Sequence, residues 1–196
     1  NYQGGEFRQN KDLEQVNIIL GFEGVDFYSD LYYPTAVYST VLGAGMSSRL
    51  FQEIREKRGL CYTIFSFTQM QNSSGVFGFY AGTSPNDVDQ LLEASLIEWK
   101  KIKKFISSEE LDRAKSQMKS GFIMGQESNS SRSEYFAKNM ISFRKLIETK
   151  EVIRSIENIS ISSIYDLCEK LLNSAKPVLS VIGPNANSLK KLEIST

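Results

Sequence analysis

The 196-residue sequence contains no histidine, and this absence excludes several kinds of catalytic site. Catalytic zinc sites usually draw two or three imidazole ligands, and serine or cysteine nucleophiles are usually activated by a histidine base. The chain alone therefore supplies neither a zinc site of the usual kind nor a histidine-dependent nucleophile.

Cysteines and long apolar runs are also scarce. Each of the two cysteines, Cys61 and Cys168, lies in an apolar-periodic stretch where a small buried side chain is usual, so no disulfide framework is expected. No apolar run approaches the ~20 residues of a membrane helix, and the first residues do not resemble a signal peptide. The chain begins at Asn1 rather than at a methionine, which indicates a fragment or a processed product.

Charge of one sign is not in excess, because 23 basic residues balance 23 acidic ones. A neutral chain has no global field to gather nucleic acid or an anionic membrane, so neither is expected as a partner. The basic cluster at 100–104 is interpreted as the solvated face and end of a helix. The length and the ordinary apolar content favour a single globular domain over residues 1–196.

Hydrophobic periodicity changes along the chain in an order that indicates an α+β fold. A strand is predicted from Leu13 to Phe22, a hairpin over 61–69 and 76–81, and a last strand over 177–183. Between them the sequence predicts helices, with start signals at Asp30, at Ser47 or Ser48, at 84–87, at Ser107, at 131–134, at Glu148 and at Ser160. Without regular βαβ alternation, a largely antiparallel sheet with helices packed on one face fits best.

The glycines at 43–45 offer the start of a dinucleotide-binding fingerprint. The third glycine is missing, and a helix rather than a strand precedes the motif. A flexible turn between two helices is the preferred interpretation.

The segment 47–62 has two interpretations. By spacing alone it is an amphipathic helix with a charged outer face, ending in a glycine turn and a strand. However, Arg55 and Tyr62 are placed so that the turn can bring a guanidinium and a phenol to one edge of the sheet. There they are able to address a carbonyl oxygen or a developing oxyanion.

Residues 45–62, GMSSRLFQEIREKRGLCY, closely resemble the signature of the second homologous domain in the pitrilysin, or insulinase, family of inverzincin zinc peptidases. They are most similar to bacterial proteins akin to mitochondrial processing peptidase. Segments 12–24, 75–82 and 107–115 also resemble that domain in the same order, so the resemblance covers nearly the whole chain.

This resemblance implies the second, zinc-free half of a two-domain hydrolase whose halves close around an extended peptide. The first half carries H-x-x-E-H, whose histidines bind zinc and whose glutamate activates water. The second half contributes an arginine and a tyrosine that hold the substrate, and these correspond to Arg55 and Tyr62. The loop at 43–45 is a weaker candidate for substrate contact. No metal ligand or catalytic base is expected in this chain alone.

Two functions remain open at this point. One is the back half of an active processing-type endopeptidase, with zinc held by a partner half on the same or another polypeptide. The other is a non-catalytic assembly subunit of the same fold, similar to the core proteins of a respiratory complex. The resemblance to bacterial members implies the cytoplasm as the compartment, with the mitochondrial matrix or the periplasm as alternatives.

Overall fold

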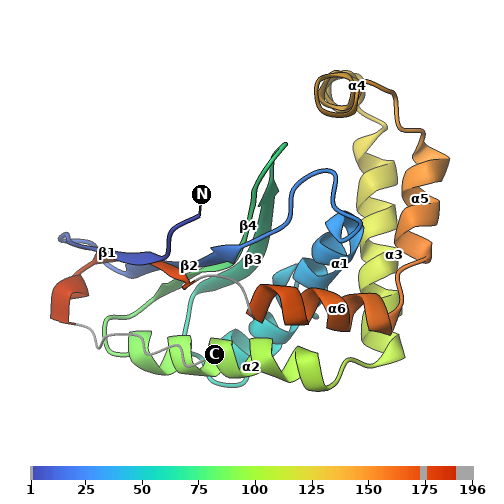
Figure 1. Ribbon diagram of the computed structural model, residues 1–196. Coiled ribbons are helices and arrows are strands. Elements are labelled where there is room, and N and C mark those ends of the chain that lie inside the picture. The colour runs from blue at the N-terminus through green and yellow to red at the C-terminus, as the bar shows by residue number, and fades with distance from the viewer. Residues whose placement is uncertain (1, 173–175, 189–196) are drawn as a thin grey trace.

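The computed structural model describes residues 2–172 and 176–188, and its centre is a five-stranded sheet in the order β1-β5-β2-β4-β3 (Figure 1). Three of the four strand pairings are antiparallel, and only β1 and β5 run parallel. The prediction of a largely antiparallel sheet is therefore confirmed. The strands are β1 (Gly5–Asn10), β2 (Val16–Glu23), β3 (Thr63–Met70), β4 (Gly75–Thr83) and β5 (Val178–Gly183).

The helices cover one face of this sheet, as Figure 1 shows for α2 and α6. None of the helices in the described ranges is long and apolar enough to cross a membrane. The helical elements are α1 (Tyr32–Gly43), the π-helix η1 (Phe51–Glu56), α2 (Val88–Lys104), α3 (Ser108–Gly125), α4 (Asn129–Phe143), α5 (Thr149–Glu157), α6 (Ile161–Leu172) and the short 3-10 helix η2 (Ala186–Ser188).

The covered face of the sheet and the helices enclose one hydrophobic core. Alternate residues of β2, from Val16 to Phe22, point into it, and Trp99 of α2 and Tyr38 of α1 are almost fully buried. Both cysteines are buried and free, as their apolar surroundings predict. Because this core is built entirely from the chain's own elements, we expect the chain to fold by itself.

Helix α1 lies close against the edge strand β3. The hydroxyl of Ser66 donates to the carbonyl of Ser39 at 2.6 Å, and both residues are buried. A Cβ at Gly43 would lie 2.3 Å from the backbone nitrogen of Ser66, so glycine permits this approach. The contact holds β3 in place, and the candidate site described below lies directly before the start of this strand.

No helix in the described ranges covers the other face of the sheet. The strand register aligns one residue from each strand in a row across it, and Phe7, Ile19 and Phe65 in this row are exposed. We call this surface the open face and define it by that row of Phe7, Ser180, Ile19, Tyr80 and Phe65. An apolar row on an uncovered sheet is uncommon for a domain that acts alone.

Several boundaries differ from the sequence prediction. Strand β1 was not predicted, and it pairs with β5 from the other end of the chain. Helix α1 begins at Tyr32, and the amide of Leu31 donates to the hydroxyl of Ser29, so Asp30 is not its cap. Helix α4 begins at Asn129, because Ser128 accepts from the amide of Ser131. The helix start predicted at 131–134 was therefore placed a few residues too late.

Other start and stop signals are confirmed. Ser107 and Glu110 form the predicted capping box at the start of α3. Ser160 accepts from the amide of Ser163 at the start of α6. The basic cluster at 100–104 forms the last turn of α2. Local helix signals of this kind depend on residues three or four apart, which explains why the sequence alone identifies them.

Candidate functional site

Helix η1 fixes the position of Arg55. Ile54 is fully buried in the core, so its neighbour Arg55 leaves the helix on the exposed side. The guanidinium carbon lies 4.7 Å from the centre of the Phe51 ring, one turn earlier. The wide π turn is closed by the amide of Lys57 donating to the carbonyl of Gln52 at 3.0 Å. Such π segments are frequent at functional sites.

A glycine turn then reverses the chain towards the sheet. Gly59 has φ +64°, which favours glycine, and open space surrounds the position of its missing Cβ. Backbone geometry rather than packing therefore explains this residue, as the sequence predicted. Its amide donates to the carbonyl of Arg55 at 3.1 Å, so the turn is tied to the residue it serves.

Tyr62 stands where the chain enters β3. Its amide donates to the carbonyl of Gly82 on β4 at 2.9 Å, which fixes the backbone. The ring nevertheless remains 65% exposed. A tyrosine that served only to fill the core would be buried, so packing does not account for this side chain.

Arg55 and Tyr62 lie at the two ends of the segment from η1 to the start of β3, which we call the rim. Burial raises the pKa of the thiol of Cys61, the residue before Tyr62, to about 11, and the charge of Arg55 opposes that rise. The guanidinium therefore acts electrostatically on the residue adjacent to the tyrosine. Within residues 2–172 and 176–188, no hydrogen bond or ion pair engages the Arg55 guanidinium or the Tyr62 hydroxyl.

The edge of the sheet continues the rim. Strand β3 is the last strand of the sheet and pairs with β4 on one side only. Among the described residues no other strand pairs with its outer side, so the backbone groups there that α1 does not approach are available to an extended chain. Two unpaired donors and a free strand edge together make a surface suited to an extended peptide backbone.

The loop at 43–46 is held more firmly than the sequence predicted. The carbonyl of Ala44 accepts from Gln117 at 3.2 Å, that of Gly45 from Ser48 at 2.7 Å, and that of Met46 from Gln52 at 2.6 Å. Gly45 has φ +89°, in agreement with a turn that needs glycine. Side chains of the chain itself therefore already bind the loop carbonyls, and the dinucleotide interpretation gains nothing from the structure.

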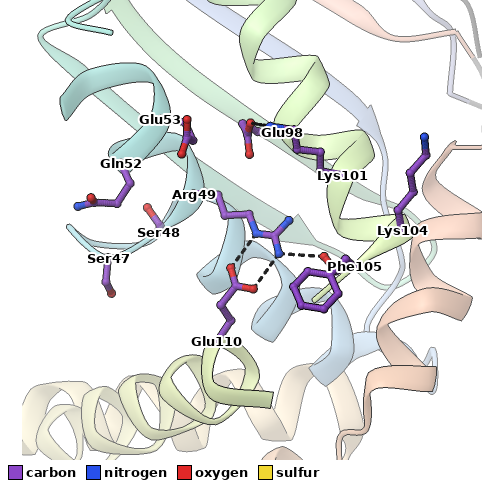
Figure 2. Close-up of a pocket in the computed structure, with 10 residues that line it drawn as sticks. All are labelled: Ser47, Ser48, Arg49, Gln52, Glu53, Glu98, Lys101, Lys104, Phe105 and Glu110. Atoms are coloured by element: carbon purple, nitrogen blue, oxygen red, sulfur yellow. Dashed lines mark hydrogen bonds and ion pairs between the residues drawn. The ribbon is translucent and has the colours of Figure 1, made fainter. Parts of the chain in front are cut away.

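A second arginine of the motif has a structural role that the sequence did not predict. Arg49 makes two 2.8 Å hydrogen bonds to the carboxylate of Glu110 and a third, at 2.9 Å, to the carbonyl of Phe105. Figure 2 shows this pair in a cavity of about 440 Å³ between η1, the end of α2 and the start of α3. The cavity is lined by Ser47, Ser48, Arg49, Gln52, Glu53, Glu98, Lys101, Lys104, Phe105 and Glu110.

The acidic side chains of the cavity form ion pairs and do not make a metal site. Each of its carboxylates is committed to a cation: Glu110 to Arg49, Glu98 to Lys101 and Glu53 to Lys57. Among the residues that the structure describes, no group of three histidine, cysteine, aspartate or glutamate side chains is arranged to hold an ion. These residues therefore do not fit a zinc ion.

The Arg49–Glu110 pair makes stability depend on pH. The hydrogen bond from Arg49 holds the pKa of Glu110 below its usual value near 4.5. A lowered carboxyl pKa stabilises the fold above the unfolded pKa, and this contribution is lost as pH falls through the folded pKa. We expect Glu110→Gln, which keeps the capping box, to cost about 1–3 kcal/mol at pH 7. The difference from wild type should shrink as pH falls below the unfolded pKa of about 4.3 and vanish only below the lowered folded pKa.

Thermal melts of both proteins across this pH range measure the effect. The matched control is Glu134→Gln on α4, because Glu134 pairs with Lys138 in a largely exposed ion pair. Exposed pairs of this kind contribute little to stability, so this variant should melt close to wild type. A melting temperature of Glu110→Gln equal to that of the control would show that the Arg49–Glu110 pair does not stabilise the fold.

Comparison with known sequences identifies the family of this chain. The sequence profile described as the peptidase M16 inactive domain matches residues 1–118. A protein of Rickettsia felis named an uncharacterized zinc protease is 39% identical over 185 residues, which are 94% of this chain and 45% of that protein. The chain thus spans about half the length of the curated relatives it matches.

Solved structures show the same fold. A protease from Helicobacter pylori superposes with a TM-score of 0.83 at 24% identity, over 91% of this chain and 44% of that one. A chain of complex III from Candida albicans superposes with a TM-score of 0.86 at 21% identity, over 95% of this chain and 47% of that one. At these identities the likeness concerns the fold alone.

The family profile covers more than half of the chain and includes the rim from η1 to β3 that carries Arg55 and Tyr62. The resemblance noted on residues 45–62 is thereby confirmed. The chain belongs to the peptidase M16 family, as its inactive domain.

Proposed function

We propose that this chain is the substrate-binding and chamber-closing half of a zinc-dependent endopeptidase that acts on extended peptides or presequences. The chain as a whole forms the second domain of a two-domain peptidase. A companion half with H-x-x-E-H supplies the zinc and the general base, and the bound zinc activates the attacking water. The observation that carries the proposal is the pair of exposed, unpaired donors Arg55 and Tyr62 beside the open edge of β3.

The residues of this half bind and orient the substrate. Arg55 is proposed to donate from its planar guanidinium to a carbonyl oxygen of the substrate. Tyr62 is proposed to donate its hydroxyl proton to the substrate backbone or to the oxyanion of the tetrahedral intermediate. Neither group acts as nucleophile or base, so the chain alone is expected to be inactive.

A second candidate function is a non-catalytic assembly subunit. The likeness to a chain of complex III from Candida albicans favours it, because that chain has the same fold within a larger complex. An assembly role needs docking surfaces but no free donors aimed at a substrate. The gene region encoding the companion half discriminates the two, since H-x-x-E-H there means a peptidase and its absence favours the subunit.

We expect the isolated chain to bind no stoichiometric zinc and to cleave no peptide. It has no histidine, and its two cysteines are buried and lie far apart in the sequence. Adding the separately produced companion half should restore cleavage of an internally quenched peptide. Metal analysis after chelation and reloading, followed by the activity assay, measures both.

The companion half alone is the control. Full activity of that half by itself would mean that this chain has no part in peptide cleavage. One tightly held zinc ion per isolated chain would also contradict the proposal.

A further inference from the structure

A second cavity, of about 890 Å³, lies among the helices and apart from the rim. It is bordered by the loop before α1, by α1, α3 and α5, and by α4, which Figure 1 shows at the far ends of α3 and α5. None of residues 47–62 lines this cavity, so the proposed function makes no use of it. Its volume is in the range of pockets that hold small organic molecules.

Aromatic rings form much of the cavity lining. Tyr32 and Tyr33 of α1 meet edge to face, with ring centres 4.9 Å apart. Tyr135 of α4 meets Phe122 of α3 in the same way at 5.4 Å, and buried Ile156 of α5 also lines the cavity. Rings in such arrangements offer both faces and edges to a further flat ring. The lining therefore suits a flat apolar molecule.

One polar group inside the cavity lacks a partner. Asn139 of α4 lines the cavity and is only 5% exposed, and its Nδ2 atom makes no hydrogen bond within the described residues. A buried donor without an acceptor is destabilising, and such groups are rare in folded proteins. The χ2 torsion of asparagine is broad, so a small rotation turns this amide towards an acceptor in the cavity. The missing partner is therefore a hydrogen-bond acceptor.

The electrostatics of the cavity favour an uncharged ligand. Burial raises the pKa of Tyr33 to about 12, and the neighbouring Tyr32, Tyr135 and Glu151 add to the rise. The phenol is therefore neutral at pH 7, and a ligand anion would meet the same burial and the same carboxylate. Lys145 in the lining already pairs with Glu151 at 3.3 Å, and burial disfavours a ligand cation as well.

We propose that this cavity binds a small uncharged molecule with a flat apolar body and a carbonyl-type oxygen that accepts a hydrogen bond from Asn139. The rings of α1, α3 and α4 pack against the apolar body, and the amide fixes its orientation. The cavity shares no residue with the rim, so the inference goes beyond the proposed function and stands independently of it.

The test uses prodan, an uncharged naphthalene ketone whose fluorescence shifts to the blue in apolar surroundings. Titrated into chain 1–196, it should bind at a single saturable site with blue-shifted emission and raise the melting temperature. Naphthamide should displace it at least about tenfold better than naphthoate, which has the same shape but carries a charge that the cavity would have to bury.

Three variants locate the bound probe. Asn139→Leu keeps the size of the side chain and removes the donor, so the dissociation constant for prodan should rise about three- to tenfold. Ala36→Trp fills the cavity from α1 and should abolish binding. The matched control is Asn129→Leu, the same substitution at the exposed first residue of α4 and outside the cavity, which should keep the wild-type constant.

Melting curves show which variants are folded. Prodan binding that survives in folded Ala36→Trp places the probe elsewhere, as on the open face, and overturns the inference. An unchanged or lower dissociation constant in Asn139→Leu, equal displacement by naphthoate, or no saturable binding by wild type overturns it as well. If the companion half displaces prodan, the cavity receives a part of that half instead of a small molecule, and the inference fails while the proposed function stands.

Discussion

We expect Tyr62→Phe to lower kcat of the assembled peptidase by about 10²-fold, the loss typical of a missing oxyanion donor. The substitution keeps the ring and removes only the hydroxyl. That hydroxyl has no hydrogen-bond partner among the described residues, so its loss should not weaken the fold. The largest change is therefore expected in the transition state, with kcat and kcat/KM falling together.

Steady-state kinetics on an internally quenched peptide measure this effect, with thermal melts and zinc content as checks. The matched control is Tyr165→Phe on helix α6, which packs against α1 and α2 and carries neither proposed donor. It removes the same atom and should leave kcat unchanged. If Tyr62→Phe has wild-type kcat and KM, the hydroxyl has no part in catalysis. That result would favour the second candidate function, a non-catalytic assembly subunit.

The local elements of this fold follow from the sequence, whereas the non-local ones do not. The hairpin β3–β4 has β-rich runs around a polar turn, and α3 has a capping box, so residues a few positions apart define both. Strand β1, GEFRQN, has a single large apolar residue, Phe7, and gains its order from β5 more than 170 positions away. No periodicity over six residues reveals such a pairing.

The candidate site divides in the same way. The motif indicated Arg55 and Tyr62, but it does not show which motif arginine is free. Arg49 and Arg55 are both charged residues of one short segment, and only the fold places Glu110, 61 positions away, against Arg49. The exposure of Tyr62 cannot be predicted from local sequence either. Tyr62 is two positions before Ile64, so strand alternation predicts that both side chains are buried. Ile64 is buried, whereas Tyr62 is exposed because it precedes the first residue of β3.

The free arginine leads to the second large effect, on Arg55. We expect Arg55→Ala to lower kcat/KM of the assembled enzyme by roughly 10- to 100-fold, mostly through KM, because a charge-assisted hydrogen bond to the substrate backbone forms already in the ground state. Arg55→Lys keeps the charge and the proximity to Phe51 but loses the planar fork. It should therefore be nearly as damaging as alanine if the guanidinium grips a carbonyl oxygen.

The comparison needs a control that changes charge without touching the proposed grip. Arg58→Ala removes one positive charge from the exposed end of the same helical segment, so a purely electrostatic effect would appear in it as well. Kinetics at low and high salt separate the two cases, since long-range attraction is screened and a direct hydrogen bond much less so. If Arg55→Lys retains wild-type kcat/KM while Arg58→Ala loses as much as Arg55→Ala, the rim attracts substrate by charge alone. The specific role of Arg55 would then be wrong, and Tyr62 would remain the single residue of this half in contact with the reacting peptide bond.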